Sequence, residues 1–401
     1  MGPSIKLAEM PADQPVESRP ADPAVCALLR AVAQRSQPTS AEEIDRLAAE
    51  IRDWDALLRL AQEHRVAALL YSRVEASSPA IPAGVVQRLR AEYRRNAFHS
   101  LTNAAELIGL LKALEGAGIP AMPMKGVVLA ASAYGNLTTR PAGDLDVLIE
   151  WKHMQRATAI MLERDYVLKT ELVKNGIPVF KDNHQYQFER RSDGLIVELH
   201  WRIDLVFAKF RHNLGLDWAS RRRRTTLLAG AEVPDMSPEL TLLMLCTHGS
   251  KHIWPRLIWI TDAAQLIESQ PSLDWAEVIR EAKRSGLWRA LALGVLLAKR
   301  IGGAAVPEAV LSRFESDPVA SKIARQIELN LFEAPGSPPP GRVPYNIKLL
   351  SFRDRVLLVL SLDFLRPNEK DLEFVSLPRP LNFLYWLVRP IRVLRNVATG
   401  R

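Results

Sequence analysis

The stretch TRPAGDLDVLIE, residues 139–150, joins two aspartates to an apolar run. Residues 145–149 have the composition of a buried β-strand, with Asp144 at its start and Asp146 inside it. An isolated carboxylate is costly to bury and is rarely found without a partner. The stretch therefore predicts a strand that has a cationic partner close to its two acids.

The spacing of the two aspartates indicates what that partner is. Alternate side chains of a strand share a face, so Asp144 and Asp146 point one way and Leu145 and Val147 the other. At about 7 Å between Cα atoms, two carboxylates can converge on one metal pair. Ligand sets made of oxygen alone suit a hard cation, Mg²⁺ or Mn²⁺, bound jointly with phosphates. The alternative is a turn cap at Asp144 and a surface position on an edge strand at Asp146.

A third acid lies in a similar apolar setting. Glu198 stands inside LIVELHW, residues 195–201, which also has the composition of a strand. If this strand lies beside residues 145–149, Glu198 completes an Asp–Asp–Glu triad. Such a triad is the setting for two-metal phosphoryl or nucleotidyl transfer. His200 shares the face of Glu198 and is either a partner of the metal ligands or a core histidine.

The segments around these strands predict a small mixed α/β core over residues 117–232. A strand at 119–124 is followed by a short helix. A second helix follows the aspartate strand at about 152–165, and residues 184–201 form two strands around a turn at 192–194. The arginine-rich stretch after this core, 221–240, is expected to be a linker.

The flanks of the core have helical periodicity. Residues 24–116 and 233–335 predict an N-terminal and a C-terminal helical domain, with Ser237 capping the helix that begins at Pro238. Residues 1–23 are rich in proline and aperiodic, and they are expected to be disordered. Residues 336–401 form a Pro-rich joint and an apolar, basic C-terminal segment. The expected fold class is α+β, a small mixed sheet between helical domains.

Composition narrows the partners. The 401 residues are 48% hydrophobic and 24% charged, as in ordinary globular proteins, and the formal net charge is +8. This charge favours an anionic partner such as a nucleotide, a nucleic acid or an acidic membrane surface. Nucleic acid is disfavoured because the chain has no patch of interleaved aromatic and basic residues. We expect a cytoplasmic protein for three reasons. The two cysteines are far apart, no apolar run reaches 18 residues, and no signal-peptide pattern is present.

These motifs together resemble the polymerase-β-like nucleotidyltransferase superfamily. More narrowly, the chain is similar to a bacterial family known as uncharacterised nucleotidyltransferase. The likeness rests on Lys-Gly after the first strand, Arg-Pro before Gly-Asp-Leu-Asp, a Glu-Leu-His-Trp strand and a later helix pair. In this sequence these are Lys125 and Gly126, Arg140 and Pro141, Asp144 and Asp146, Glu198 to Trp201, and His248, Lys251, His252 and Asp262. The wider superfamily has Gly-Gly or Gly-Ser where this chain has Lys-Gly, and 18 positions separate Gly126 from Asp144 here, more than is common.

The resemblance implies a palm-like sheet on which Asp144, Asp146 and Glu198 are catalytic and bind Mg²⁺ or Mn²⁺. It implies transfer of a nucleoside monophosphate from an NTP such as ATP, with release of pyrophosphate. The acceptor, a small molecule or a protein, is not identified by the sequence. The alternative is a non-catalytic module that senses or binds nucleotide on the same fold. A third hypothesis is a peripheral membrane partner in an envelope polysaccharide or peptide pathway, docked through the C-terminal basic helix.

Several residues are predicted to hold the triphosphate. Gly126 opens a short helix, whose N-terminal N–H groups attract phosphate, and Lys125 adds a charge beside it. Arg140 can do the same from the loop before Asp144, and Gly143 and Lys251 complete the predicted set. The alternatives are a solvated strand end for Lys125 and a loop residue tied to a backbone carbonyl for Arg140.

Two further features leave alternatives open. His248 and His252 stand four apart on one helix face, which suits a zinc site, a packed histidine pair or a face that meets substrate. They are also candidates for positions close behind the metal ligands. The C-terminal YWLVRPIRVLR, residues 385–395, has apolar and basic residues at helical spacing. It fits either an interfacial helix on an anionic membrane or a helix that docks on the protein's own core.

Overall fold

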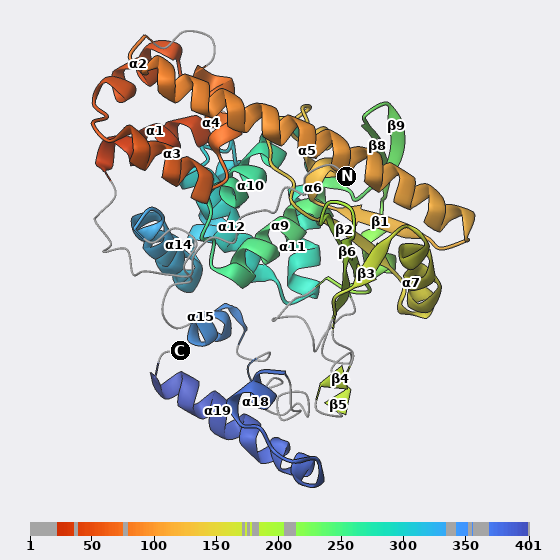
Figure 1. The fold of residues 1–401 in the computed structure, drawn as a ribbon. Coiled ribbons are helices and arrows are strands. Elements are labelled where there is room, and N and C mark those ends of the chain that lie inside the picture. Colours follow the sequence, from red (N-terminus) through yellow and green to blue (C-terminus); the bar gives the residue numbers. More distant parts are fainter. Residues whose placement is uncertain are drawn as a thin grey trace.

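The computed structural model describes residues 22–35, 39–74, 79–170, 173–174, 177–178, 184–203, 214–333, 342–351, 355 and 369–399. Helices from the N-terminal part lie above a central helix bundle, the sheet lies beside that bundle, and the last helices lie below it (Figure 1). The expected disordered tail falls outside the described residues except for positions 22 and 23. Pro23 already begins the first helix, α1, with Asp22 as its N-cap.

The central sheet has five strands in the order β1-β2-β7-β6-β3. Strand β2 runs parallel to β7, and the other neighbours are antiparallel. The mixed sheet predicted from the sequence is therefore confirmed. Its strands are β1 (Ala121–Met124), β2 (Leu145–Ile149), β3 (Tyr166–Leu168), β6 (Gln185–Arg190) and β7 (Ile196–His200).

The two central strands divide their side chains between a core and a site. Val147 of β2 and Val197 of β7 pack into an apolar cluster that also includes residues of α5 (Ala83–Gly116) and α7 (Met154–Glu163). The alternate side chains face the opposite way. The register sets Asp146 directly opposite Glu198, so the two acids meet side by side.

One long helix ties the N-terminal helices to the sheet. Helix α5 has 34 residues; it packs on α4 near its start and on β1 and α6 farther along (Figure 1). It ends at Gly116, and Gly118 beyond it has a positive φ of 65°. This end agrees with the predicted boundary of the N-terminal helical domain at residue 116, where glycines favour a helix stop. The preceding helices are α1 (Pro23–Ala33), α2 (Ala41–Ala49), α3 (Trp54–Glu63) and α4 (Ala67–Val74).

The helices after the sheet form the central bundle. Ser237 caps the first of them through a 3.3 Å hydrogen bond from Leu240 N, as predicted. Its end and the start of the next helix lie on either side of Pro255. The bundle comprises α9 (Pro238–His252), α10 (Leu257–Ser269), α11 (Trp275–Arg284), α12 (Trp288–Arg300), α13 (Glu308–Glu315) and α14 (Pro318–Asn330).

The helices that precede the sheet in the sequence and those that follow it share one hydrophobic core. Leu28 and Leu70 from the N-terminal part belong to the same buried cluster as Leu243, Leu257 and Leu291. The two helical regions that the sequence sets apart are thus packed together. The chain folds back so that both regions face the carboxylate side of the sheet.

The expected linker after the sheet is partly wrong. Residues 224–235 form a hairpin of β8 (Arg224–Leu228) and β9 (Ala231–Asp235), and the predicted boundary at 232 falls inside β9. The turn at Ala229 and Gly230 has positive φ at both positions, which suits a two-residue hairpin. Arg221, Arg222 and Arg224 of the basic run lie 3.6, 3.9 and 3.0 Å from acidic side chains.

The C-terminal part contributes α15 (Arg342–Leu349), α18 (Glu369–Phe374), η2 (Arg379–Leu384) and α19 (Tyr385–Thr399). Helix α15 occupies the second half of the expected Pro-rich joint, whose first half lies outside the described residues. The expected basic apolar helix at the end of the chain is present as α19. Among the described helices, none combines the length and the apolar character needed to cross a membrane. Short elements elsewhere are α6 (Gly126–Ser132), η1 (Trp151–His153), α8 (Leu216–Ala219), β4 (Val173–Lys174) and β5 (Ile177–Pro178).

Candidate functional site

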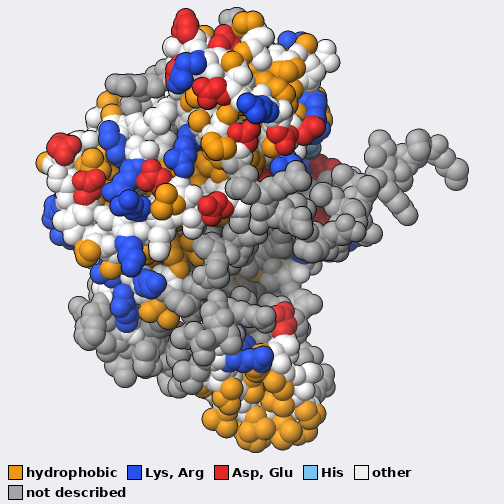
Figure 2. Space-filling view, turned by 90° about the vertical axis from the view of Figure 1, so that its left-hand side faces the viewer, with side chains coloured by type: hydrophobic (Ala, Val, Ile, Leu, Met, Phe, Trp, Pro, Cys, Tyr) orange, Lys and Arg blue, Asp and Glu red, His pale blue; other side chains and the backbone are white. Residues whose placement is uncertain are grey.

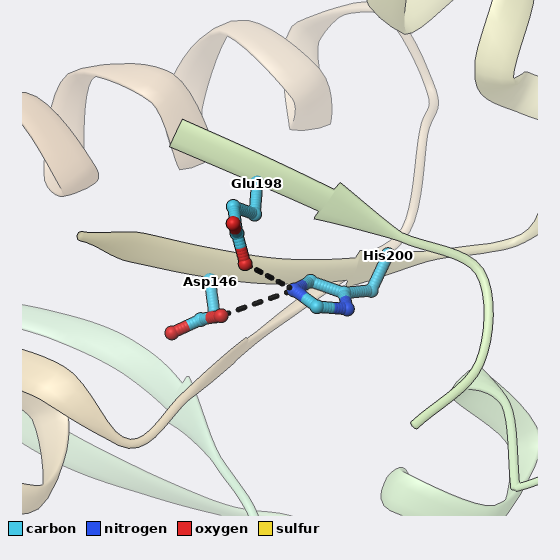
Figure 3. A group of neighbouring side chains, drawn as sticks. All are labelled: Asp146, Glu198 and His200. Atoms are coloured by element: carbon cyan, nitrogen blue, oxygen red, sulfur yellow. Dashed lines mark hydrogen bonds and ion pairs between the residues drawn. The ribbon is translucent and has the colours of Figure 1, made fainter. Parts of the chain in front are cut away.

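Three side chains from the two central strands meet on the face opposite the apolar core (Figure 3). His200 Nε2 lies 3.0 Å from Asp146 Oδ1 and 3.4 Å from Glu198 Oε2. One ligand atom from each residue falls within 4.8 Å of the others. The strand pairing produces this cluster directly, because Asp146 and Leu148 stand opposite Glu198 and His200.

Lys125 supplies the positive charge of the cluster. It follows β1, and its Nζ contacts Asp146 Oδ2 and lies 3.8 Å from Asp144 Oδ2. Its backbone is left-handed, with φ at 44°, and Gly126 after it has φ at 55°. A bulky residue is rarely found in this conformation, and backbone strain of this kind concentrates at functional sites.

The charges of the cluster stabilise one another. Burial alone would lower the pKa of Lys125, but Asp146 and Asp144 raise it above its ordinary value. Burial would likewise raise the pKa of Asp146, and the opposing effect of Lys125 and of the hydrogen bond from His200 lowers it strongly. Asp146 is therefore a buried, ionised carboxylate. The pKa of His200 is raised, because Asp146 and Glu198 outweigh the effect of burial.

Asp144 stands apart from this group. It precedes the first residue of β2, and its side chain is 43% exposed, whereas that of Asp146 is 2% exposed. Figure 3 and the ligand geometry thus put His200, and not Asp144, next to Asp146 and Glu198. Asp144 remains within reach through Lys125, which lies between the two aspartates.

A cavity of about 530 Å³ is lined by Lys125, Asp144 and Glu198, whereas Asp146 and His200 are buried and are not part of its lining. Part of the lining comes from the sheet and part from the helix bundle. The cavity therefore lies between the apolar cluster of the sheet and that of the bundle. Its walls include eight residues that the sequence predicts as site residues: Lys125, Gly126, Arg140, Gly143, Asp144, Glu198, His248 and His252. Lys251 is not part of the lining, and its assignment to nucleotide binding stays a prediction.

Arg140 is held by the protein itself. Its Nε and Nη2 donate to the two carboxylate oxygens of Asp262 at 2.8 and 2.9 Å. Its Nη1 donates to the carbonyls of Gly126 and Pro141 at 3.0 and 3.3 Å. Asp262 also accepts from the Tyr134 hydroxyl at 2.8 Å. The geometry favours the alternative reading of Arg140, a residue that ties its loop to other parts of the chain.

The two histidines of α9 pack with an aromatic ring. The ring centroids of His248 and His252 are 4.9 Å apart, and Trp259 lies 4.8 Å from His248 and 5.4 Å from His252. Burial, with the nearby charge of Lys125, holds the pKa of His248 well below its ordinary value. Within the described part of the chain, no third zinc ligand joins the pair. The ring contacts agree with a packed pair, and the place of both histidines in the cavity wall leaves a face that meets substrate open as well.

Sequence reasoning missed several residues of the cavity wall, among them Arg65, Arg256 and Trp259. Arg65 lies between α3 and α4, and Arg256 directly precedes α10. Each is an arginine at a helix end, which is common and gives no local signal. Only the fold brings them to one wall opposite the carboxylates.

Comparison with known proteins places these elements in a family. Residues 50–303 match the model of a family described as uncharacterised nucleotidyltransferase. The chain belongs to this family. The matched region includes the whole lining of the cavity. A solved structure of an antigenic nucleotidyltransferase-like protein from Paracoccidioides brasiliensis is similar at 19% identity with a TM-score of 0.28, over 49% of this chain and 93% of that chain. No curated protein matches the chain.

The side chains of this nucleotidyltransferase site suit a hard divalent cation. Asp146 and Glu198 offer carboxylate oxygens, Asp144 adds a third at the open end, and His200 offers a ring nitrogen. Lys125 stands where positive charge is needed, against the most buried of the acids. Carboxylate-rich sites of this kind favour Mg²⁺ or Mn²⁺ over softer ions.

Proposed function

We propose that this chain moves a nucleoside monophosphate from an NTP to a hydroxyl of an unidentified small-molecule or protein acceptor, with Mg²⁺ or Mn²⁺ bound by Asp144, Asp146 and Glu198. The observation that supports this most is the pairing of Asp146 with Glu198 on adjacent buried strands, with Glu198 and Asp144 in the lining of the cavity. Family membership supports the class of reaction.

The reaction assigns a task to each part of the site. A bond forms between the acceptor oxygen and the α-phosphorus, and the bond from that phosphorus to the β-phosphate bridging oxygen breaks, so pyrophosphate leaves. The divalent ion supplies charge stabilisation at the phosphorus. Glu198, whose side chain is 18% exposed and lines the cavity, accepts the hydroxyl proton. His200 holds Asp146 and Glu198 in position through Nε2. Lys125 lies against Asp146 and Asp144 and can balance charge on the phosphates.

A nucleotide sensor without turnover is the alternative on the same fold. It needs a cavity and cations but has little use for a buried carboxylate paired with a second one. Asp146 is 4% exposed, and Lys125 and His200 supply the pairing that makes burial of its charge tolerable. The paired acids therefore favour the transferase.

Calorimetric titration with ATP, GTP, CTP and UTP, each with and without Mg²⁺, tests the proposal. We expect one NTP to bind in a Mg²⁺-dependent manner and Asp144→Asn/Asp146→Asn to abolish the dependence. Asp55→Asn/Asp193→Asn removes two exposed carboxylates outside the cavity and is the matched control. Absence of binding by any NTP under either condition would contradict the proposal.

A second proposal concerns the C-terminal segment, which we assign to contact with an anionic lipid surface. Large apolar side chains gather at the lower end of the molecule, where η2 and α19 lie (Figure 2). The exposed ones are Leu381, Phe383, Trp386, Leu387 and Ile391. The apolar exposure supports an interfacial position, whereas Arg389 and Arg392 of α19 pair with the buried Asp371, and Arg395 lies over the Phe374 ring.

Flotation with phosphatidylglycerol vesicles tests this second proposal. The intact protein is expected to float with the vesicles, and Phe383→Ser/Leu387→Ser to stay in solution. Floating of both proteins alike, or of neither, would contradict a role for this face. A vesicle of phosphatidylcholine alone shows whether lipid charge matters.

A further inference from the structure

Two arginines on the cavity wall stand without an acidic partner. Arg65 and Arg256 both line the cavity, and in the described part of the chain neither guanidinium makes an ion pair or a hydrogen bond. Arg256 lies over the Trp259 ring, whose centroid is 5.7 Å from its Cζ. By contrast, Arg140 in the same wall has its donors occupied.

The two guanidiniums lie close enough to repel each other. The pKa of Arg256 is lowered, first by burial and then by the charge of Arg65, and Asp144 opposes this in part. Arg256 is half-buried and Arg65 is exposed, so a ligand in the cavity can reach both, and two like charges on one wall favour a bound anion. The arrangement therefore suits a bound anion better than the free protein.

Both arginines lie on turns that the fold fixes. Arg65 has a left-handed φ of 57°, and Ile253 and Trp254, just before Pro255 and Arg256, have φ of 66° and 51°. Three non-glycine residues in this region of φ are unusual, and such strain persists only where surrounding packing enforces it.

The packing that enforces it joins the two turns to each other. Leu257 N donates to His64 Nδ1 at 3.1 Å, and Ile258 N donates to His64 O at 3.2 Å. Trp254 is fully buried against Gly249, where a Cβ would come within 2.6 Å of its ring. The two guanidiniums are thus set in advance on a rigid support, which lowers the entropic cost of binding.

The arginine pair lies at the Asp144 end of the carboxylates. Arg65 Nη1 is 3.8 Å from where a Cβ on Gly143 would stand, and Asp144 attracts Arg256. Lys125 approaches Asp144 from the other side at 3.8 Å. A chain of phosphates that begins at the carboxylates and passes Asp144 would therefore end between the two guanidiniums.

We propose that Arg65 and Arg256 bind the β- and γ-phosphates of the nucleotide, with Trp259 supporting Arg256. This inference rests on the proposed function and names the part of the substrate that this wall receives. A guanidinium offers a planar pair of donors that matches phosphate oxygens. The charge balance agrees. Apart from the Arg140–Asp262 pair, three cations (Lys125, Arg65, Arg256) face three acids (Asp144, Asp146, Glu198). Divalent ions on the acids would leave an excess of positive charge that a polyphosphate neutralises.

Calorimetry with four probes on the full chain tests this assignment: inorganic tripolyphosphate, the NTP that binds best, and the matching NDP and NMP, each with and without Mg²⁺. Arg65→Gln/Arg256→Gln is the test variant. Arg52→Gln/Arg59→Gln, two exposed arginines near α3 and outside the cavity, removes the same charge and is the matched control. We expect the test variant to lose at least tenfold in affinity for tripolyphosphate and the NTP and to keep its affinity for the NMP. Arg256→Lys, which keeps the charge without the planar fork, is expected to fall between the two.

The outcomes separate this inference from the proposed function. Mg²⁺-dependent NTP binding with equal affinity in the test variant and the wild type would overturn the arginine assignment and leave the transferase standing. It would also direct attention to a phosphorylated acceptor as the anion for this wall. An equal loss of affinity for the NMP would overturn the assignment too, because the arginines would then not distinguish the terminal phosphates. A third outcome is that the test variant loses affinity for tripolyphosphate, while the wild type binds the NTP no more tightly than tripolyphosphate and Mg²⁺ has no effect. This result would support a polyphosphate site and contradict the transferase.

Discussion

Two buried charge clusters of this protein contain the same kinds of side chain and differ in what is left over. In the first, Arg140, Asp262 and Tyr134 satisfy one another through a two-pronged ion pair and a hydroxyl bond. In the second, Lys125 and His200 face the acids Asp146 and Glu198, with Asp144 close by. The first cluster is closed by its own geometry. The second keeps an acid-rich surface toward the cavity.

The difference shows how to tell a structural tie from a site. The Arg140–Asp262 pair joins the loop before β2 to α10, which are 122 positions apart in sequence. Every strong interaction there ends on another protein group. Around Asp146, the charge is balanced by Lys125, whose backbone is strained, and the neighbouring Asp144 is half-exposed. This is the state expected of groups that await a ligand.

Breaking the closed cluster should have the largest effect on stability. Arg140→Ala leaves Asp262, which is 1% exposed, as an unpaired buried charge. We expect the free energy of unfolding to fall by about 3–5 kcal/mol, the usual cost of removing one partner of a buried pair. Urea denaturation followed by circular dichroism measures it. Arg140→Met/Asp262→Leu removes both charges and should recover much of the loss, and a double variant as unstable as the single one would contradict this account.

The same Asp→Asn substitution in each of the two clusters should separate an effect on NTP binding from an effect on folding. Asp146→Asn is expected to weaken Mg²⁺-dependent NTP binding by about a hundredfold, because it removes a metal-ligand charge worth several kcal/mol. Asp262→Asn is expected to change the affinity of the folded protein by less than about threefold, a difference under 1 kcal/mol. Titration calorimetry well below each melting temperature compares them. A larger loss of affinity in Asp262→Asn would assign Arg140 to the nucleotide, as the sequence suggested.

Much of the carboxylate cluster could be predicted from the sequence because strand alternation is a local rule. Asp146, Glu198 and His200 each stand in an apolar strand, and their common face follows from a period of two. The partner of Arg140 could not be predicted in this way, since Asp262 lies far along the chain and any surface arginine has the same local pattern. Arg65 and Arg256 were missed for the same reason.

The fold shows the same division between local and distant information. The strands at 121–124, 145–149 and 185–200 and the stop of α5 at the glycines follow local patterns. The hairpin at 224–235 was taken for a linker because it directly follows a run of arginines and its turn, Ala229-Gly230, is a weak signal. The shared core of the flanking helices depends on contacts between Leu28 or Leu70 and residues such as Leu257, which no local pattern contains.

A third buried group, His64, belongs with the structural ties and gives a pH test. Burial, with the charge of Arg256, lowers its pKa from 6.5 to about 4 in the folded protein. The unfolded chain therefore binds a proton near pH 6.5 that the folded chain does not, so stability falls as the pH drops from about 6.5 to about 4. At pH 5 the loss from this group is about 2 kcal/mol.

His64→Gln removes this titration. The drop in unfolding free energy between pH 7 and pH 5 should be about 2 kcal/mol smaller in the variant than in the wild type. Urea denaturation at the two pH values measures it, and the constant cost of lost packing cancels in the difference. An equal drop in both proteins would show that His64 is protonated without penalty. The hydrogen bond from Leu257 N to its Nδ1 would then not be maintained.

The smallest effect should be the change in the Mg²⁺ response of the melting temperature when Lys125 is removed from the cluster around Asp146. Lys125→Met leaves the acids around Asp146 without their ammonium, so the variant should be less stable without metal and should gain more from Mg²⁺ than the wild type does. At ten times its Kd, a ligand adds about 1.4 kcal/mol to the free energy of unfolding. In a chain of this size that is a rise of about a degree or two in melting temperature. Arg140→Met, matched in the residue introduced but located in the closed cluster, should show no extra gain from Mg²⁺. Equal Mg²⁺ responses in all three proteins would mean that the acids around Asp146 do not hold the ion, and the contrast between the two clusters would lose its chemical meaning.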